Sequence, residues 1–508
     1  MNKVIFILLY FMLFTNVYAQ QNSVNKEHKV TFKLKITEQT ITDSIAIIWF
    51  IPPYLEKKTV IHHSLFPKSL NTNGLYEQTI TFPDSLTGKT VTYYYEAAQY
   101  EYDLKRSLVL EENKVQQKIE TWGYYEGLEG KVKPGRMLFV EPNSREEKKM
   151  FAEPYTGITA DGKPIEDLYP IKKTGFSTVP IKNAVSAFIA SLTEEQKSLS
   201  TFPIASNEWR RWHNIEDWSR AGVCFEDLNT LQKELAFVFL KESLSTQGLQ
   251  KAKNIMTMEV YLATLAPENK DLGGEKYWFT FMGIPSDTQP WGWQMEGHHL
   301  IINYFVLGDQ VVMTPTFMGS EPNLVETGEN KGVRTFEMEE KKGFDFYLSL
   351  NSTQKEKATI FNKKEYDFNQ TEAFRDNQIV PTTGISAKKL SKAQQAMLLD
   401  LIAEYVNNVR DGQAKIKMAE VNKYLNQTHF TWIQGSDTNS PFYYRIHSPV
   451  ILIEFDHQTP IFLYDHSKPR PGPVKSHIHT VVRSPNGNDY GKDLLKAHLE
   501  KEHKQEKN

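Results

Sequence analysis

The sequence predicts an α+β protein in which an internally duplicated domain of helices followed by strands comes after a small all-β sandwich. Three observations lead to this prediction. Residues 28–122 read as short strands, two later segments each contain periodic helices and then aromatic strands, and each later segment carries a histidine pair. The expected boundaries are a signal peptide at 1–19, the sandwich at 28–122, a linker at 123–153 and the α+β domain at 154–503, with halves of about 181–330 and 340–503.

The composition of the 508 residues excludes several classes of function. Lys and Arg number 59 and Asp and Glu number 62, so the net charge is −3 and no basic face for nucleic acid is expected. No Rossmann or P-loop glycine pattern occurs, so we expect no nucleotide cofactor. Cys224 is the only cysteine. It therefore forms no intramolecular disulfide, and we expect it to be a small buried hydrophobe.

The first nineteen residues have the features of a cleavable secretory signal. Lys3 precedes an unbroken apolar run over 4–14, and Ala19 offers a small residue before the polar Gln20. The run is too short to span a bilayer. No later stretch contains eighteen apolar residues, so we expect a secreted or periplasmic protein without a transmembrane segment in its mature chain.

The segment 28–122 predicts a small antiparallel sandwich, because alternating or β-prone runs are separated by turn residues. The expected strands are 30–36, 44–50, 76–82 and 90–96. The stretches 73–77, 79–83 and 88–93 resemble starch-binding or immunoglobulin-like modules of secreted enzymes. That resemblance allows sugar binding by aromatic side chains, although these can equally form the core; they are Tyr93, Tyr95, Tyr100 and Trp122.

Residues 123–153 contain glycines, prolines and a run of charges over 145–149. Such a composition interrupts regular structure. It indicates a linker or a segment that wraps around a neighbouring domain.

Four capping boxes mark helix starts in the rest of the chain. In each, a polar cap accepts the backbone N–H three residues later, and a glutamine there reaches back to the N–H of the cap. The caps are Thr193, Asn229, Asn351 and Ser391. An aromatic strand is expected after each helix pair, at 277–281 and 442–446. The plain interpretation is two related halves packed as one α+β unit.

Two histidine pairs and one acidic strand hold the candidate site residues. His298 and His299 precede a predicted strand at 300–306, and they face one site together only if His298 lies in the loop. His477 and His479 on a strand would project to the same side, about 7 Å apart. In the buried strand within 449–458, Glu454 and Asp456 share one face and His457 follows.

This pattern predicts a divalent metal site, because zinc and copper take three or four imidazole or carboxylate ligands and a catalytic site keeps one position open. The candidate ligands are His298, His299, His457, His477 and His479. Glu296 or Asp456 would serve as a carboxylate ligand or activate bound water. Arg483 would orient an anionic or polar substrate. The alternative is a set of hydrogen-bonded core histidines, which predicts no metal.

Other kinds of catalytic site have less support. No Gly-x-Ser-x-Gly elbow occurs, and Cys224 lacks a recognisable catalytic partner. A catalytic pair of carboxylates, as in glycosidases, stays an alternative, because the fold and not the sequence sets the distance between them. Residues 486–491 predict a turn before a last helix that contains Leu494 and Leu495.

Residues 154–503 resemble the secreted-protein family known as domain of unknown function 3500. The resemblance lies in uncommon motifs at 154–159, 209–212, 291–293, 297–300, 315–319, 443–445, 453–458, 477–479 and 486–495. It implies that the histidine segments belong to the shared pattern of the family, and it implies no activity. The sandwich lies outside the resemblance and reads as an accessory module.

Together these features predict a secreted metal-dependent enzyme of unknown substrate, a hydrolase in the first interpretation. The alternative is a non-catalytic extracytoplasmic protein that binds a metal or a carbohydrate. A closed four-ligand site would favour binding, and an open three-ligand site would favour catalysis. The expected partner is a small-molecule or glycan substrate, with polysaccharide suggested only by analogy with other secreted enzymes that carry a sandwich.

Overall fold

A computed structural model of the chain describes residues 28–36, 45–51, 60–97, 106–111, 115–121, 140, 144–433, 439–468 and 470–505. The predicted signal peptide at 1–19 lies outside these residues. The described residues of Met1–Ala98 and Lys105–Trp122 form one compact unit, and those of Gly123–Asn508 form another. Among the described residues, no helix is both long enough and apolar enough to cross a membrane.

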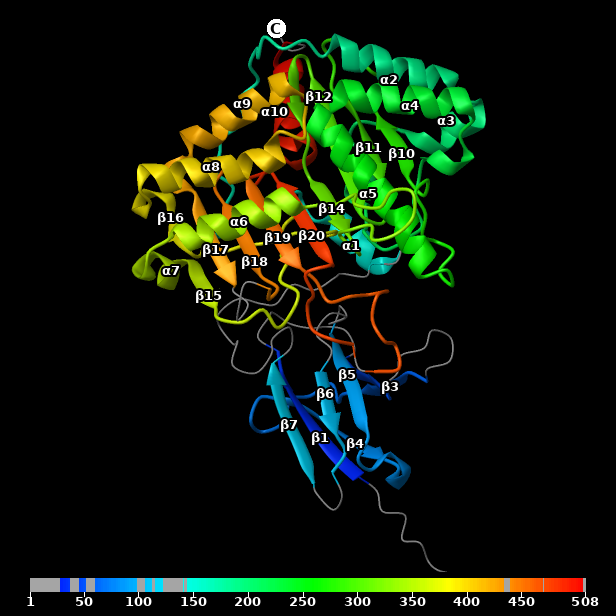
Figure 1. Cartoon of the computed structure of the whole chain (residues 1–508), viewed down its shortest axis with the longest axis vertical. Helices are drawn as coiled ribbons and strands as arrows, with labels where there is room; N and C mark the ends of the chain where they lie inside the picture. Colours follow the sequence, from blue (N-terminus) through cyan, green and yellow to red (C-terminus); the bar gives the residue numbers. More distant parts are fainter. Residues whose placement is uncertain are drawn as a thin grey trace, which may run out of the picture. The chain divides into compact units, whose positions relative to one another are not determined.

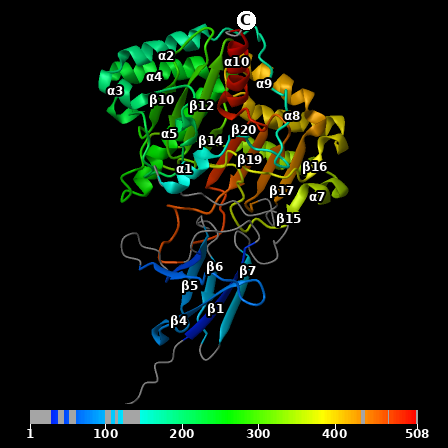
Figure 2. The ribbon, with the colours of Figure 1, turned by 180° about the vertical axis from the view of Figure 1, so that it is seen from behind.

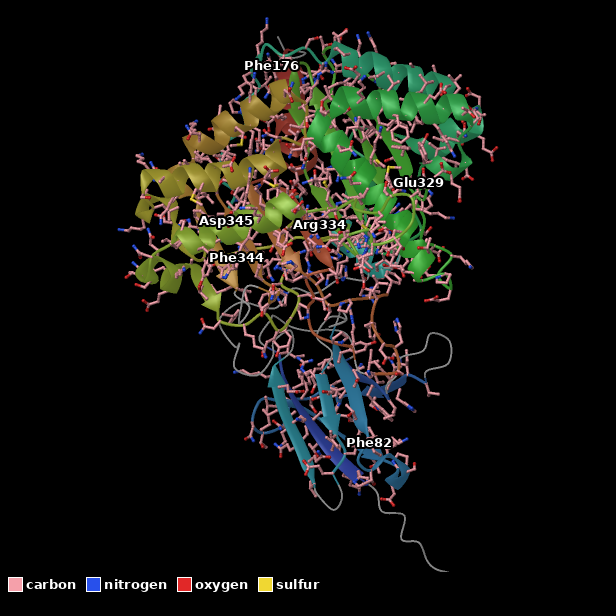
Figure 3. All side chains as sticks on the ribbon, in the orientation of Figure 1. Phe82, Phe176, Glu329, Arg334, Phe344 and Asp345 are labelled. Atoms are coloured by element: carbon pink, nitrogen blue, oxygen red, sulfur yellow. The ribbon has the colours of Figure 1, made fainter. Side chains whose placement is uncertain are left out.

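The first unit contains two sheets that pack face to face (Figure 1). The first sheet has the order β4 (Tyr76–Phe82), β1 (His28–Lys35) and β7 (Gln116–Thr121). The second has the order β3 (His62–Leu65), β2 (Ile45–Phe50), β5 (Thr90–Ala97) and β6 (Arg106–Val109), with the 3₁₀ turn η1 at Asp84–Leu86. The prediction of a small all-β region is confirmed, although β1 pairs with β7 in parallel. Inward-facing residues such as Phe32 and Phe82, the latter labelled in Figure 3, are fully buried between the sheets.

The aromatic residues of this unit serve its core where the structure describes them. Tyr93 and Tyr95 are fully buried, and their hydroxyls donate to the Glu120 carboxylate at 2.8 and 2.5 Å. These two side chains therefore offer no surface for a sugar. Tyr100 and Trp122 lie outside the described residues.

The second unit is built on a thirteen-stranded sheet. The main path runs β15 (Thr359–Phe361), β17 (His429–Ile433), β18 (Tyr443–His447), β19 (Leu452–His457), β20 (Ile478–Arg483), β14 (Thr316–Ser320), β12 (Leu300–Leu307), β11 (Trp291–Glu296), β10 (Trp278–Met282) and β8 (Thr201–Phe202). Three short strands lie off this path: β9 (Val223–Cys224) pairs with β10, β16 (Ile385–Ser386) with β17, and β13 (Gln310–Val312) with β12. Cys224 is free and buried, as expected.

The four predicted capping boxes are all present, each with both of its hydrogen bonds, and they start α3, α4, α7 and α8. The helices before the central strands are α2 (Val179–Ser191), α3 (Glu194–Ser200), α4 (Thr230–Ser243) and α5 (Thr246–Leu265). Their counterparts in the second half are α6 (Glu337–Ser349), α7 (Ser352–Ala358), α8 (Lys392–Val406) and α9 (Asp411–Lys423). The 3₁₀ turns are η2 (Asn207–Arg210), η3 (Phe225–Asp227), η4 (Ala387–Lys389), η5 (Leu425–Gln427) and η6 (Asp489–Gly491).

Strand pairing shows the duplication directly and corrects one detail of it. In each half a short strand pairs in parallel with the first long strand, β8 with β10 and β15 with β17. A second short strand pairs antiparallel with that same long strand, β9 with β10 and β16 with β17. The counterpart of β10 is therefore β17, whereas the sequence pattern had matched it to 442–446, which forms β18. The two halves meet where β14 pairs with β20.

The two faces of this sheet carry separate cores. On one face, α2, α4, α5, α6 and α8 pack against residues such as Ile302 and Ile478. On the other face lie α1 (Arg145–Ala152) and α10 (Lys492–Gln505) (Figure 2). These helices contribute residues that pack with Phe317 and Val481. Because side chains alternate along a strand, His479 lies on the second face, with Phe317 and Val481.

Part of the predicted linker is a structured element. Its charge run forms α1, capped by Ser144, whose side chain accepts the N–H of Glu147. Glu147 is buried and forms an ion pair of 2.7 Å with Arg211. The described part of this segment therefore packs against the α+β unit, as the wrapping alternative expected.

Candidate metal centre

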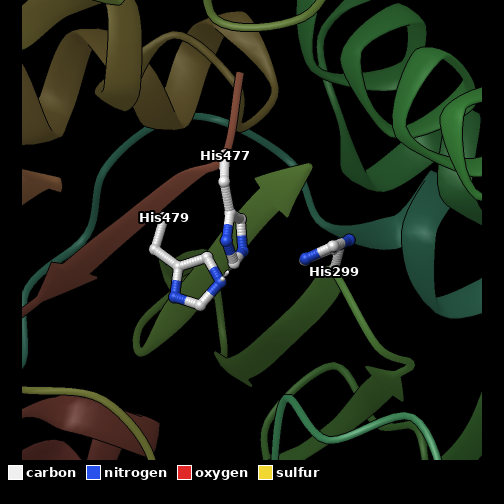
Figure 4. A group of neighbouring side chains, drawn as sticks. All are labelled: His299, His477 and His479. Carbon is white, nitrogen blue, oxygen red and sulfur yellow. Dashed lines mark hydrogen bonds between the residues drawn. The ribbon is translucent and has the colours of Figure 1, made fainter. Parts of the chain in front are cut away.

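Three imidazoles meet at the junction of the two halves (Figure 4). His299 ends the loop between β11 and β12, His477 immediately precedes β20, and His479 lies within β20. The antiparallel pairings of β12 with β14 and of β14 with β20 bring these segments side by side. The three rings are almost fully buried, with exposed fractions of 1, 2 and 4%.

Gly319 on β14 leaves the space that the rings occupy. It lies opposite His479 in the β14–β20 ladder. A Cβ atom at this position would lie 2.9 Å from Cδ2 of His299 and 3.1 Å from Cδ2 of His479. A side chain at position 319 would therefore push both rings away from their present positions.

Each of the three rings is held through its Nδ1 atom by an oxygen acceptor. Nδ1 of His299 contacts the Glu259 carboxylate, Nδ1 of His477 lies 2.7 Å from the Thr459 carbonyl oxygen, and Nδ1 of His479 lies 2.9 Å from Glu372 Oε1. A carbonyl or an ionised carboxylate oxygen only accepts hydrogen bonds, so each Nδ1 carries the hydrogen. The lone pair of each neutral ring is then on Nε2. Oxygen acceptors on the far nitrogen are the usual support of metal-ligating histidines.

The three Nε2 atoms have the arrangement expected around a cation. Nε2 of His477 lies 3.1 Å from Nε2 of His479, and the buried Nε2 of His299 has no hydrogen-bond partner among the described residues. The three ligand atoms lie within 4.8 Å of one another. Burial holds the pKa values of His477 and His479 well below their usual range and lowers that of His299 to about 4. Neutral rings that face each other with lone pairs repel unless a cation lies between them, so the donor set fits a metal ion.

The cluster offers three ligands rather than four. Among the residues that the structure describes, no further His, Cys, Asp or Glu atom joins this group. Zinc bound by three protein ligands keeps a fourth position for water or substrate, whereas structural zinc sites fill all four. The cluster therefore has the number of protein ligands that an open zinc site would need.

Glu259 connects the centre to His298. The carboxylate of Glu259, on α5, contacts Nδ1 of His299 with one oxygen and lies 3.1 Å from Nδ1 of His298 with the other. Burial raises the pKa of Glu259, but the two imidazoles outweigh burial and hold that pKa below its usual range. Burial lowers the pKa of His298, and Glu259 more than reverses this, so the pKa is raised. His298 thus lies in the loop and converges on Glu259, while only His299 reaches the three-histidine cluster.

The structure places His457 away from the cluster, which corrects its predicted role as a ligand. Its Nδ1 accepts the N–H of Phe442 at 2.9 Å, and its Nε2 lies 3.7 Å from Glu340. His457 neighbours Asp456 on β19 and therefore points to the opposite face of the sheet from Asp456 and His479, which are paired in the ladder.

Glu296 and Asp456 have protein partners that compete with their predicted chemistry. Glu296 accepts the N–H of His213 at 2.9 Å and pairs with Arg220 at 3.2 Å, while burial raises its pKa to about 7. Asp456 pairs with the buried Lys364 at 2.9 Å and accepts the N–H of Phe368 at 2.6 Å. Neither carboxylate joins the group of ligand atoms.

Arg483 has a different role from the predicted one. Its side chain is fully buried and pairs with Asp376 at 2.9 Å and Asp489 at 3.2 Å. It also donates to the carbonyl oxygens of Thr371 and Glu372 at 2.9 and 2.8 Å. A guanidinium engaged in this way is not available to a substrate. It instead holds the segment from which Glu372 supports His479.

Sequence reasoning missed Glu259, Glu372 and Thr459. Glu259 had a detectable signal, because it lies on the apolar face of α5 with Ile255, Met258 and Leu262 at helical spacing. A carboxylate on such a face needs a partner. Glu372 and Thr459 lie in loops without a periodic pattern, so only the tertiary structure identifies them.

We expect Gly319→Ala to lower metal affinity by at least about tenfold. Losses of this size are usual when the groups that hold metal ligands in place are mutated. The reason is the short approach of a Cβ atom to both rings. Equilibrium dialysis with Zn²⁺ measures the effect. Gly273→Ala is the matched control, because a Cβ there has its nearest neighbour at 3.5 Å. Equal affinities of the two variants would contradict the assigned geometry.

Glu259→Gln should weaken metal binding by roughly 10- to 100-fold, because an amide supports the His299 ring less strongly than a carboxylate. The substitution keeps the size of the side chain, so the fold should persist. Competition with a chromogenic chelator gives the affinity, and Glu226→Gln, an exposed glutamate paired with Lys276, is the control. An unchanged affinity would show that Glu259 does not hold a ligand.

A solved structure titled as CBMd, family CBM41, from Eubacterium rectale Amy13K matches with 15% identity and a TM-score of 0.14 over 19% of this chain and 92% of that chain. A match of this extent carries no conclusion about ligand binding. No curated protein sequence matches the chain. The family described as protein of unknown function (DUF3500) matches residues 174–492, within the range that the sequence motifs predicted, and the chain therefore belongs to this family.

Proposed function

We propose that this protein is an exported metal-dependent hydrolase whose centre is formed by His299, His477 and His479. The observation that carries the proposal is the convergence of three Nε2 lone pairs, each set by an acceptor on Nδ1. Zinc is the first candidate, because it accepts three imidazoles and keeps one open position. Copper is the second candidate, because imidazole also suits it.

A metal ion in a three-histidine site supplies a bound water whose pKa is lowered to about 7. The chain contributes the positions of the surrounding groups. Glu259, Thr459 and Glu372 fix the three rings. Among the described residues, Oε2 of Glu372 receives no donor, while its Oε1 accepts from Asn369 and His479. Burial raises the pKa of Glu372 to about 7, and this carboxylate supports His479 from Nδ1, the nitrogen that faces away from the cluster.

The burial of the three rings favours the second candidate function, a non-catalytic metal-binding protein. Phe462, in the segment after β19, lies edge-on to His298 with ring centroids 5.7 Å apart. Water still has to reach the open position for hydrolysis to occur. Exchange of bound water with solvent is thus the property that separates the two functions.

The test uses the full-length protein purified without a histidine tag. Metal content is measured by mass spectrometry, and hydrolysis of ester, peptide and glycan panels is compared among the native, chelator-stripped and zinc-reconstituted protein. The proposal expects activity that disappears on stripping and returns with zinc. Bound metal without any hydrolysis would favour the non-catalytic function. A protein that takes up none of zinc, copper, manganese and iron would contradict both functions.

A further inference from the structure

A half-buried arginine lies beside the histidine cluster without a carboxylate partner. Arg470 belongs to the segment that joins β19 to β20. Its Nε donates to the Pro460 carbonyl oxygen at 2.7 Å, and its Nη2 donates to that of Thr459 at 3.0 Å. Within the described residues, no carboxylate oxygen lies within 4.0 Å of its guanidinium.

Three more deeply buried arginines of the same unit pair with carboxylates: Arg210 with Asp376, Arg220 with Glu296, and Arg483 with Asp376 and Asp489. Arg445 has no such ion pair among the described residues, and its Nη2 donates to the Pro381 carbonyl oxygen and the Thr383 hydroxyl. A guanidinium presents five N–H donors, of which Arg470 uses two in these contacts. Its remaining donors form the planar arrangement that matches a carboxylate or phosphate group.

Two acidic side chains accept hydrogen bonds from the backbone of the segment that carries Arg470. The carboxylate of Glu321 accepts backbone N–H groups at 2.9 to 3.3 Å from Ile461, Phe462 and Leu463. Asp367 accepts the N–H of Thr459 at 2.8 Å. Both carboxylates hold the segment around Arg470 in place, and neither lies within 4.0 Å of its guanidinium.

One carbonyl oxygen connects Arg470 to the metal centre. The Thr459 oxygen that accepts from Nη2 of Arg470 also accepts from Nδ1 of His477, at 3.0 and 2.7 Å. The guanidinium therefore lies two hydrogen bonds from a ring whose other nitrogen belongs to the cluster. A substrate that contacts both the centre and Arg470 therefore has to span the His477 ring, because the Thr459 oxygen is bonded to Nδ1 and the cluster forms at Nε2.

We propose that Arg470 binds an oxyanion of the substrate, a carboxylate or a phosphoryl group, and thereby makes the site selective for anionic substrates. This inference rests on the proposed metal-dependent function and names its substrate class. Arg470 then has the role that the sequence pattern had given to Arg483.

The test measures anion binding to the cobalt-loaded full-length protein through its visible spectrum. Acetate has a single carboxylate and serves as the probe that contacts the metal but not Arg470. Malonate, succinate and glutarate carry a second carboxylate at increasing distance, and phosphonoacetate replaces one carboxylate by a phosphoryl group. At least one of these two-headed anions should bind about tenfold more tightly than acetate, the scale of a hydrogen bond to a charged group. Comparing malonate with phosphonoacetate identifies which oxyanion Arg470 prefers.

Arg470→Gln should reduce this preference to about twofold or less while leaving acetate affinity within about twofold of the parent. Arg470→Lys keeps the charge without the planar donor pair and should retain part of the preference. Lys468→Gln removes a charge from the same segment at an exposed position paired with Asp465, and should retain all of it.

Three results would overturn the inference. They are the absence of any preference in the parent, its persistence in Arg470→Gln, and an equal weakening of acetate and the two-headed anions, which a purely structural contact would produce. Failure of the parent to bind cobalt would overturn the proposed function together with this inference. Cobalt binding with no role for Arg470 would overturn the inference alone.

Discussion

Replacing His477 and His479 together by alanine is expected to remove bound metal while the protein stays folded. The parent should hold about one ion per chain, because three imidazoles form one site. The double variant keeps only His299, and a single imidazole does not retain the ion against dialysis. His477 immediately precedes β20 and His479 lies within it, and the ladder contacts of β20 with β14 and β19 are made by the backbone. Metal analysis by mass spectrometry, with circular dichroism to check the fold, gives the result.

Thermal unfolding adds an independent measurement of the same site. A metal at a concentration a thousand times its Kd stabilises the folded state by about 4.1 kcal/mol. Zinc should therefore raise the Tm of the parent and leave that of the double variant unchanged. His429→Ala is the matched control, because this half-buried histidine lies on β17 of the same sheet and outside the cluster. Metal that persists in the folded double variant would exclude this centre.

Arg483→Met should cost about 3–5 kcal/mol of unfolding free energy, the usual penalty for removing one partner of a buried ion pair. The side chain is fully buried, and its loss leaves Asp489 without its guanidinium partner and Asp376 with only Arg210. Chemical denaturation followed by tryptophan fluorescence measures the change. Arg334→Met, at an exposed position labelled in Figure 3, should change the unfolding free energy by no more than about 0.5 kcal/mol.

The destabilisation should depend on pH. Burial raises the pKa of Asp376, but Arg483 and Arg210 outweigh it and hold that pKa below the ordinary value. A lowered folded pKa contributes stability above the unfolded pKa, and this contribution is lost as pH falls through the folded pKa. The difference between the parent and Arg483→Met should therefore be largest near neutral pH and decrease in acid. A variant as stable as the parent would instead support the predicted role of Arg483 in substrate binding.

Much of the local structure could be predicted because its causes lie within a few residues. The four capping boxes need only a polar cap and a glutamine three positions later, and all four start helices. The spacing of His477 and His479 indicates one shared face because strand side chains alternate. The rings indeed lie beside each other, with centroids 4.7 Å apart.

The assignment of strands to the two halves shows where such reasoning stops. The aromatic segments 277–281 and 442–446 look alike, yet β18 is the counterpart of β11. Hydrophobicity records that a strand is buried, but not which neighbours it pairs with. Pairing depends on register between distant segments, which the tertiary structure decides.

The sequence by itself determined the fold class, the helix starts, the membership of His299, His477 and His479 in a candidate set, and the family. Only the tertiary structure separated these three residues from His298 and His457, and only it supplied Glu259, Thr459 and Glu372 as their supports. The physical reason is that a metal centre needs lone pairs aimed at one point. The direction of each lone pair depends on the strand register across β12, β14 and β20. It also depends on the hydrogen bonds between each Nδ1 and an oxygen acceptor from another segment of the chain.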